Sequence, residues 1–370
     1  MPHLRPFALE RFFARHEFSV NHLACASDPD AWTTKELLAL EPGAEAKYLA
    51  LPLGYTETMG HPELRAAIAA LDPGLSPADV LVHAGAEEAI YAFMHVVLSA
   101  EDHAIVHVPA YQSLYEVAQG IGAHVARWEA RESQGWLPDP GELERLVTAK
   151  TKVLVLNTPH NPTGAHLPRA FLDAAITFAR RHGLWLFSDE VYRGLEYGAP
   201  RHPPVATLYE RGVSLGATAK VYGLAGLRIG WVACRDHALL ERLATFKDYL
   251  TICSAGPSEF LATVAMRHAG TLAGRSRAIV TENLARVDEL FARRPDVFQW
   301  VRPVAGTTAF PRLVRGEATA FTERLLADTG VLLMPGPLFD FDDAHVRLGL
   351  GRRSLAQALP LLDEWLSRQA

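Results

Sequence analysis

A lysine, a carboxylate and an amide follow separate apolar runs in this 370-residue sequence, at Lys220, Asp189 and Asn161. A lysine amine can form a Schiff base with a carbonyl compound and then exchange a proton with a bound substrate. A carboxylate that follows the run LWLF should be largely desolvated, so it needs a cationic partner. We expect these side chains to perform covalent and proton-transfer chemistry on a small molecule, provided that the fold brings them together.

The apolar runs are predicted strands that alternate with helices between about residue 60 and residue 235. Strands are expected at 80–85, 103–108, 152–157, 184–188, 213–219 and 228–234, and helices at 61–71, 86–100 and 168–183. This order is typical of a mainly parallel sheet with helices on both faces, in which ligands bind beyond the carboxyl ends of the strands. At these ends the sequence offers a glycine turn, an aromatic ring, an amide, a carboxylate and an amine: Gly85, Tyr111, Asn161, Asp189 and Lys220.

After about residue 255 the pattern changes to long helices, shorter strands and a final amphipathic helix. This part is predicted to form a smaller α+β domain together with the N-terminal segment. The expected fold class is therefore α/β, with a large domain built on a mainly parallel sheet and a smaller α+β domain. The large domain is predicted at 46–255, and the small domain at 1–45 and 256–370.

Charge and composition argue against several classes of function. The net charge of −6 comes without a basic stripe, so nucleic acid is not an expected partner. No apolar run reaches the length of a membrane span, and the N-terminus lacks the apolar segment of a signal peptide. Cys25, Cys234 and Cys253 show no metal-ligand spacing, so we expect reduced thiols, a cytoplasmic protein and no metal site.

Three longer motifs resemble one known family. NTPHNPTG (157–164), SDEVYRGLEY (188–197) and ATAKVYGLAGLRIGW (217–231) are similar to motifs of the fold-type I pyridoxal-phosphate enzymes. These enzymes form the aspartate aminotransferase superfamily, which includes the class I/II aminotransferases. The resemblance covers nearly the whole chain, and its residues occur in the family's order and near its intervals: Asn161, Asp189, Tyr192, Lys220 and Arg228.

The resemblance implies that pyridoxal 5'-phosphate is bound as a Schiff base on Lys220, which also serves as general base on the substrate. It implies that Asp189 keeps the pyridinium nitrogen of the cofactor protonated. It also implies that Asn161 and Tyr192 donate hydrogen bonds to the phenolic oxygen. The predicted catalytic residues are therefore Lys220, Asp189 and Tyr192.

The cofactor phosphate is expected at the turn formed by Gly85, Ala86 and Glu87, where backbone N–H groups open a helix. Arg228 would add a charge-assisted contact to the phosphate. Tyr111 matches the aromatic residue that stacks on the cofactor ring in the family.

The sequence departs from the family just before the lysine. Family members commonly carry hydroxyl residues one and three positions before it, whereas this sequence has Ala219 and Ala217. Thr218 lies between them, and the sequence leaves open whether it compensates. Cofactor retention is expected to depend more on the 85–87 turn and on Arg228.

The resemblance also implies how substrate and a second subunit are bound. Arg347 matches an arginine that grips the substrate α-carboxylate, next to Asn161, because a guanidinium fork suits a carboxylate. The nearby Arg352 and Arg353 are expected to be surface charges. Tyr55 matches a tyrosine that reaches the phosphate of the partner subunit, so a homodimer with shared active sites is expected.

Substrate choice is expected to depend on the N-terminal segment 22–38, which replaces a Gly-containing loop that many aminotransferases place over the substrate. Asp28 and Asp30 either meet a cationic side chain of the substrate or serve as caps and solvated charges. The N-terminal helix LERFFARHEF and the short polar turn after it resemble those of capreomycidine synthase and related arginine-acting enzymes.

The expected function is an aminotransferase that moves an amino group between an α-amino acid and a 2-keto acid. The alternatives are a lyase, or an oxidase or cyclase of an arginine-like substrate, on the same scaffold and with the same cofactor residues. The effector domain of a transcription regulator is disfavoured, because the fold begins within about 45 residues of Met1. The sequence does not name the donor or the acceptor.

Overall fold

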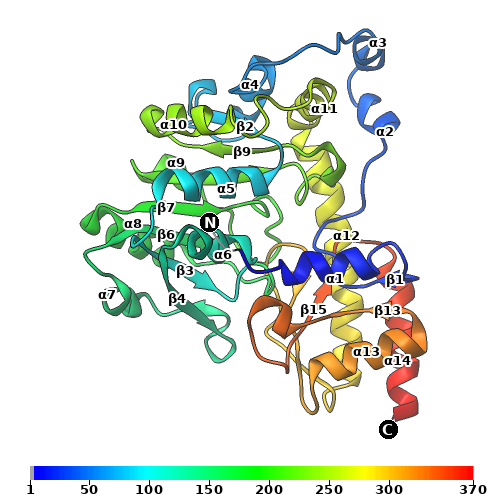
Figure 1. The fold of residues 1–370 in the computed structure, drawn as a ribbon. Helices are drawn as coiled ribbons and strands as arrows, with labels where there is room; N and C mark the ends of the chain where they lie inside the picture. Colours follow the sequence, from blue (N-terminus) through cyan, green and yellow to red (C-terminus); the bar gives the residue numbers. More distant parts are fainter. Residues whose placement is uncertain (1–3, 370) are drawn as a thin grey trace.

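The computed structural model describes residues 4–369 and shows a large sheet between layers of helices, with a smaller group of elements beside it (Figure 1). The strands of the large sheet are β2 (Val80–His83), β3 (His103–Val108), β4 (His124–Arg131), β5 (Leu137–Pro138), β6 (Thr151–Asn157), β7 (Trp185–Asp189), β8 (Gly212–Ala217) and β9 (Gly230–Ala233). The helices around it are α2 (Thr34–Leu38), α3 (Ala44–Leu49), α4 (Pro62–Ala69), α5 (Ala86–Val97), α6 (Ser113–Ile121), α7 (Leu143–Leu146), α8 (Arg169–His182), α9 (Val205–Leu208), α10 (His237–Lys247) and α11 (Gly256–Arg267).

The direction of one strand determines which residues meet at the edge of the sheet. The strand order is β2-β9-β8-β7-β6-β3-β4-β5, and the central pairs from β8 to β4 are parallel. β9 is antiparallel to both of its neighbours, with Gly230 opposite Ala217. Because β9 runs backwards, Arg228, two residues before its start, lies at the same edge as Lys220, which follows the parallel strand β8.

The central strands bury apolar side chains on both faces. In β6, Val153 and Val155 pack in the core that contains α5 and α6, whereas Leu154 and Leu156 pack in the core that contains α8. A strand between two helical layers needs apolar residues at every position, which explains the continuous apolar run in the sequence. α8 ends at His182, and the next residue, Gly183, has a φ of +64°, the left-handed conformation that stops a helix.

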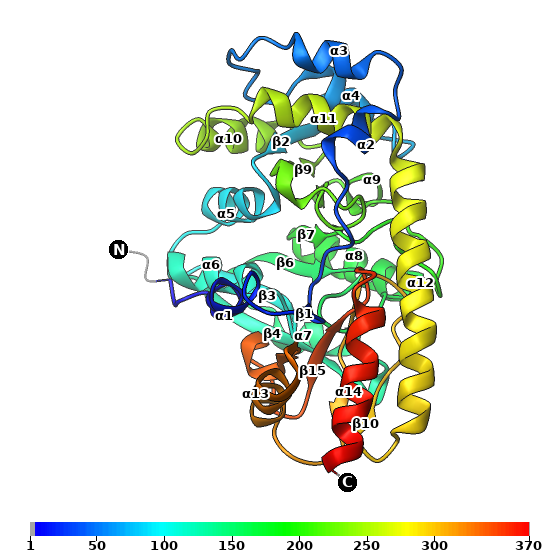
Figure 2. The same cartoon turned by 90° about the vertical axis from the view of Figure 1, so that its right-hand side faces the viewer.

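A smaller group of elements, called the small lobe here, packs beside the large sheet. Its helices are α1 (Ala8–His16), α13 (Ala318–Thr329), α14 (Leu355–Gln369) and most of α12 (Ala269–Arg293). Its strands are β1 (His22–Leu23), β10 (Phe298–Gln299), β11 (Thr308–Ala309), β12 (Arg312–Leu313), β13 (Val331–Leu332), β14 (Met334–Pro335) and β15 (Val346–Gly349). β1 pairs in parallel with β13, which joins the N-terminal segment to the C-terminal part. Figure 2 shows α12 running along both the helices of the large sheet and the small lobe.

The predicted fold class is confirmed: a mainly parallel sheet flanked by helices is accompanied by a smaller α+β part. For the domain boundaries, apolar packing favours a division different from 46–255. Leu37, Leu38 and Leu261 belong to the core of the large sheet, and α12 enters the core of the small lobe at Val280. We propose boundaries near residues 32 and 275.

Three properties of the described chain bear on function. No helix among residues 4–369 is both long enough and apolar enough to cross a membrane. In the same part of the chain, no group of three or more His, Cys, Asp or Glu side chains is arranged to hold a metal ion. Cys25, Cys234 and Cys253 are free thiols, and the first two are buried.

Replacing Phe187 by alanine should strongly destabilise the fold. This β7 side chain is fully buried, and its ring centroid lies 4.6 Å from that of Phe93 on α5. The cavity left by Phe187→Ala should lower the free energy of unfolding by about 3–5 kcal/mol in urea denaturation. Phe18→Ala is the control, because Phe18 is 94% exposed. Equal stability of the two variants would contradict the packing described here.

Candidate active site

A cavity of about 380 Å³ lies at the carboxyl edge of the large sheet, with α1 on one side. Figure 1 shows α1 across the junction of the large sheet and the small lobe. The predicted site residues other than Tyr55 all line this cavity: Gly85, Ala86, Glu87, Tyr111, Asn161, Asp189, Tyr192, Lys220, Arg228 and Arg347. The strand order therefore brings together residues that are up to 262 positions apart, from Gly85 to Arg347.

Lys220 stands three residues beyond the end of β8, and its side chain lines the cavity. Its Nζ donates a hydrogen bond of 2.8 Å to Oγ of Ser27. Ser27 is itself buried, and its carbonyl oxygen accepts from the hydroxyls of Tyr192 at 3.2 Å and Thr307 at 2.7 Å. The amine is thus held by a segment that the sequence had not connected with it.

Asp189 is the last residue of β7 and is almost fully buried. Its Oδ1 accepts the backbone N–H of Val191 at 3.2 Å. Burial raises the pKa of this carboxyl to about 7, although the charge of Lys220 acts to lower it. Among the described residues, no cation lies within 4 Å of Asp189, so a cationic group of a ligand would stabilise the ionised form.

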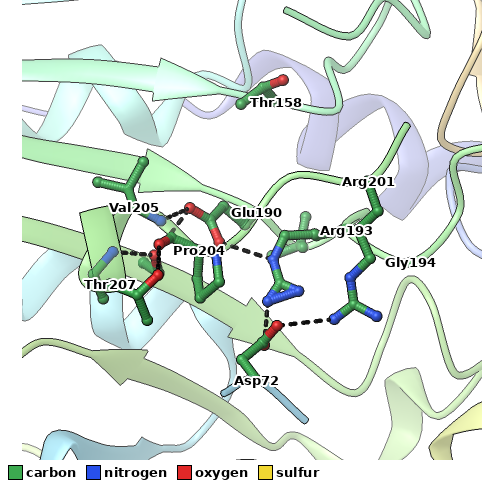
Figure 3. Close-up of polar contacts among 12 residues, drawn as sticks. Asp72, Thr158, Glu190, Arg193, Gly194, Arg201, Pro204, Val205 and Thr207 are labelled. Carbon is green, nitrogen blue, oxygen red and sulfur yellow. Dashed lines mark hydrogen bonds and ion pairs between the residues drawn. The ribbon is translucent and has the colours of Figure 1, made fainter. Parts of the chain in front are cut away.

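A network of charged residues fixes the turn after Asp189 (Figure 3). Glu190 accepts the backbone N–H of Val205 at 2.9 Å and Nε of Arg193 at 3.3 Å. Arg193 and Arg201 both bind the carboxylate of Asp72. The buried pair Glu190 and Arg193 therefore ties the turn that carries Asp189 and Tyr192 to the loop after α4.

Arg347, in β15, is 1% exposed and lines the cavity. Its Nε and Nη2 donate to the carbonyl oxygen of Cys25 at 3.1 and 2.9 Å, and its Nη1 donates to Oδ1 of Asn161 at 3.2 Å. The guanidinium lies 5.8 Å from the ring centroid of Phe13 and 5.3 Å from that of Phe339. Burial lowers the pKa of Arg347 from its usual range, and no carboxylate of residues 4–369 lies within 4 Å of it. A buried guanidinium with only neutral partners is a ready site for an anion.

Asn161 and Tyr192 place side chains with hydrogen-bond donors in the wall of the cavity. The backbone N–H of Asn161 donates to Oδ1 of Asn157 at 2.7 Å, which fixes its main chain. Because Oδ1 of Asn161 already accepts from Arg347, its amide NH₂ group remains available to a ligand. The hydroxyl of Tyr192 now donates to the carbonyl oxygen of Ser27.

The N-terminus of α5 forms a concave group of donors. Gly85 precedes the helix with φ +91°, and no side chain caps it. Within residues 4–369 the N–H groups of Ala86 and Glu87 have no hydrogen-bond acceptor. A Cβ atom at position 85 would lie 2.5 Å from Nη2 of Arg228, so only glycine lets that guanidinium approach. Free N–H groups beside an arginine at a helix N-terminus suit a phosphate.

The side chain of Glu87 also enters the cavity, although the sequence predicted a role only for its backbone. Its Oε2 has no partner among the described residues, and burial raises the pKa of this carboxyl to about 7. The nearby hydroxyl of Tyr111 donates to Oε1 of Glu10 at 3.0 Å. Burial likewise raises the pKa of Tyr111 above its usual value.

Two residues lie where they do not contribute to this cavity. Thr218 is fully buried, and its hydroxyl donates to the carbonyl oxygens of Leu224 at 3.3 Å and Ile229 at 3.1 Å. It therefore does not replace the hydroxyls missing at 217 and 219. Tyr55 is 89% exposed and lines a separate cavity of about 530 Å³ beside α11.

The aspartates of the N-terminal segment are held by arginines near the C-terminus. Asp28 lines the active-site cavity and accepts from Nη2 of Arg352 at 2.9 Å. Asp30 binds Arg353 at 3.0 Å away from the cavity. Arg352, expected as a surface charge, is half-buried, because it packs between Asp28 and Glu17.

Sequence reasoning missed α1 and Ser27 as parts of the site. Glu10, Phe13 and the C-cap residue Glu17, which keeps helical φ and ψ, line the cavity and recur every three to four residues, so they share one face. This spacing was visible in the sequence and predicts a common face. Ser27 has no such signal, because its contacts with Lys220 and Tyr192 are made only by the tertiary fold.

The fold and cavity define an α/β enzyme whose chemistry centres on an amine, a buried carboxylate and an anion site at the sheet edge. The chain matches the family model "Aminotransferase class I and II" over residues 45–359. It is 32% identical to capreomycidine synthase from Streptomyces vinaceus, over 98% of this chain and 94% of that protein. It is 34% identical to an arginine–pyruvate transaminase from Pseudomonas aeruginosa, over 73% and 70% of the two chains. The crystal structure of a PLP-dependent aminotransferase from Streptococcus suis superimposes with a TM-score of 0.93, at 32% identity, and covers 99% of this chain and 98% of that one.

The chain therefore belongs to the class I and II aminotransferase family, and its cofactor is pyridoxal 5'-phosphate. The predicted superfamily, enzyme class and cofactor are confirmed. The residues of the cavity fit this group. An uncapped helix N-terminus with Arg228 suits its phosphate, the buried carboxyl of Asp189 suits a ring cation, and Lys220 supplies an amine.

The raised pKa of Asp189 predicts a pH-dependent stability of the cofactor-free protein. Between about pH 4 and pH 7 the unfolded chain has released a proton that the folded protein still holds, so the free energy of unfolding falls as pH rises. Asp189→Asn has no carboxyl at this position, so its free energy of unfolding should not show this fall with pH. The gain in stability of the variant over the wild type should be larger at pH 8 than at pH 4.5 by on the order of 3 kcal/mol in urea denaturation. The exposed Asp173→Asn is the control, and a gain at pH 4.5 as large as at pH 8 would contradict the burial of this charge.

Proposed function

We propose that the protein is an aminotransferase that moves an amino group between an α-amino acid and a 2-keto acid, with the cofactor attached to Lys220. The observation that supports it most is the content of one cavity: the amine of Lys220, the buried carboxyl of Asp189 and the buried guanidinium of Arg347. These are the three charges that an amino acid and a pyridinium cofactor require. The arginine–pyruvate transaminase relative agrees with a transfer reaction.

When bound, pyridoxal phosphate supplies an electron sink that stabilises negative charge at the substrate Cα. Asp189 would hold the ring nitrogen, since a cation there relieves the cost of the buried carboxylate. Asn161 and Tyr192 would donate to the phenolic oxygen, and Tyr111 would cover the ring. The phosphate would be held at Gly85 by the N–H groups of Ala86 and Glu87 and by Arg228. Because the hydroxyl of Thr218 is bonded to backbone carbonyl oxygens, the phosphate would depend on the N-terminus of α5 and on Arg228.

Lys220 would carry the proton that leaves the substrate Cα and return it on the neighbouring carbon of the cofactor. Its present contact with Ser27 Oγ keeps the amine at the cavity, whose lining includes Glu10 and Phe13 of α1. Arg347 would bind the substrate α-carboxylate through its Nη groups, and Asn161 would keep that guanidinium in place. This anchoring would fix the Cα–H near Nζ of Lys220.

We also propose a cytoplasmic homodimer with shared active sites, to which Tyr55 contributes across the interface. Tyr55 is distant from the cavity of its own chain and almost fully exposed, which is unusual for a large aromatic side chain. Other exposed apolar side chains lie on the segments near it in sequence or after α10: Leu49, Leu53, Tyr249, Leu250 and Ile252. Three free thiols fit a reducing compartment.

A second candidate is a reaction that does not transfer the amino group, such as cyclisation or oxidation of an arginine-like amino acid, or elimination by a lyase. The similarity to capreomycidine synthase over nearly the whole of both chains favours it. The residues that hold the cofactor would be the same, so the site geometry does not distinguish the two reactions.

The reaction is tested by product analysis with a panel of amino acids. A transaminase forms one keto acid for each new amino acid and depends on an added keto acid, whereas a lyase releases ammonia without one and a cyclase retains the nitrogen.

Lys220→Ala should remove the cofactor absorbance band of the wild type and lower turnover by at least 10³-fold while the circular dichroism stays unchanged. Activity near that of the wild type in Lys220→Ala would overturn the attachment site.

Loss of Arg347 should weaken binding of the amino-acid substrate. Arg347→Ala should raise KM for the amino acid by about 10- to 100-fold, because a charge-assisted pair is lost. The cofactor absorbance should remain, since Arg347 is assigned to the substrate. Arg353→Ala is the control, because that side chain is exposed and paired outside the cavity. An unchanged KM in Arg347→Ala would exclude the proposed contact.

A further inference from the structure

The cavity holds more acidic groups than the proposed reaction uses. Its lining carries five acids, Glu10, Glu17, Asp28, Glu87 and Asp189, against three bases, Lys220, Arg228 and Arg347. The three bases and Asp189 all have roles toward cofactor or substrate in the proposed function. Of the remaining acids, Glu10 lies on α1 and Glu17 caps the C-terminus of that helix, and neither has a role in the proposed function.

The distance from Phe13 to Arg347 indicates where these two acids lie relative to the substrate. Its ring centroid is 5.8 Å from Cζ of Arg347, the proposed site of the α-carboxylate. Glu10 and Glu17 flank Phe13 at three and four residues, which places them about one helical turn to either side on the same face. A substrate held by Arg347 therefore has the acidic face of α1 within reach of its side chain.

The acids differ in how far the protein already satisfies them. Asp28 is paired with Arg352 at 2.9 Å, and Glu10 accepts the hydroxyl of Tyr111 at 3.0 Å. Glu17 accepts no hydrogen bond among the described residues, and its nearest cation, Arg352, lies at 4.0 Å and is shared with Asp28. Arg352 is thus shared by two carboxylates, Asp28 and Glu17, and Glu17 is the one without a hydrogen bond.

The electrostatics of Glu17 agree with a place for a cation. Partial burial raises the pKa of this carboxyl, and the charges of Asp28 and Glu10 raise it further against Arg352 and Lys220. Each of these unfavourable contributions is relieved when a positive group enters beside them.

We propose that Glu17, with Glu10 beside it, recognises a cationic group at the end of the substrate side chain, a guanidinium or an ammonium. This assignment rests on the proposed function, because it takes Arg347 as the anchor of the α-carboxylate. It makes α1 the element that selects basic over neutral amino acids.

The test compares pairs of amino acids that match in size and differ in charge: arginine with citrulline, and lysine with norleucine. The change in cofactor absorbance of the holoenzyme gives an apparent Kd for each compound, whatever reaction follows. The wild type should bind the cationic member of at least one pair about tenfold more tightly, and the pair that responds tells guanidinium from ammonium. Glu17→Gln should reduce that preference to near unity while leaving Kd for the neutral member unchanged.

Two further variants separate charge recognition from a structural effect. Glu17→Asp keeps the charge and should retain part of the preference, and Glu45→Gln, an exposed acid on α3, should behave as the wild type. A wild type without a preference for cationic members, or a preference that survives in Glu17→Gln, overturns the assignment alone. A holoenzyme whose absorbance responds to no amino acid overturns the proposed function and this assignment with it.

Discussion

The site depends on ionisable groups that are buried before any ligand is bound. Asp189 and Arg347 are nearly inaccessible to water, yet neither has an oppositely charged partner within 4 Å in the described chain. Isolated charges in such surroundings cost several kcal/mol each, so neutral donors and acceptors must hold them in place. The carbonyl oxygen of Cys25 and the amide of Asn161 do this for Arg347, and the N–H of Val191 does it for Asp189. The cofactor and an amino acid bring the missing opposite charges.

Segments from both parts of the structure hold these side chains in place. The 24–27 segment runs from the small lobe to the cavity. Oxygens of Cys25 and Ser27 there accept hydrogen bonds from Arg347, Tyr192 and Lys220. The Glu190 and Arg193 network holds the turn that follows Asp189 through its contacts with Val205 and Asp72. The preorganised site thus draws on both the large sheet and the small lobe, and its affinity for ligands is inseparable from their contact.

The sequence predicted the strand ends well, because strands buried on both faces read as continuous apolar runs. Lys220, Asp189 and Asn161 were found in this way, and the family motifs added Arg228 and Arg347. The sequence did not predict the direction of β9, since four apolar residues look alike in either direction. Nor did it predict Ser27 or the side chain of Glu87, whose positions follow from contacts between distant segments. The sequence also did not predict that Leu261 packs in the core of the large sheet, because the apolar face of a helix can pack against either core.

The 25-residue helix α12 belongs to two apolar cores, with Leu272 in one and Val280 to Phe291 in the other. A helix keeps its hydrogen bonds cooperatively, so loss of packing at one end removes support from the other. The large sheet and the small lobe are therefore expected to melt in one transition rather than one after the other. A shared strut of this kind also limits how far the two parts can rotate, and any closure over a ligand has to bend or pivot at the ends of α12.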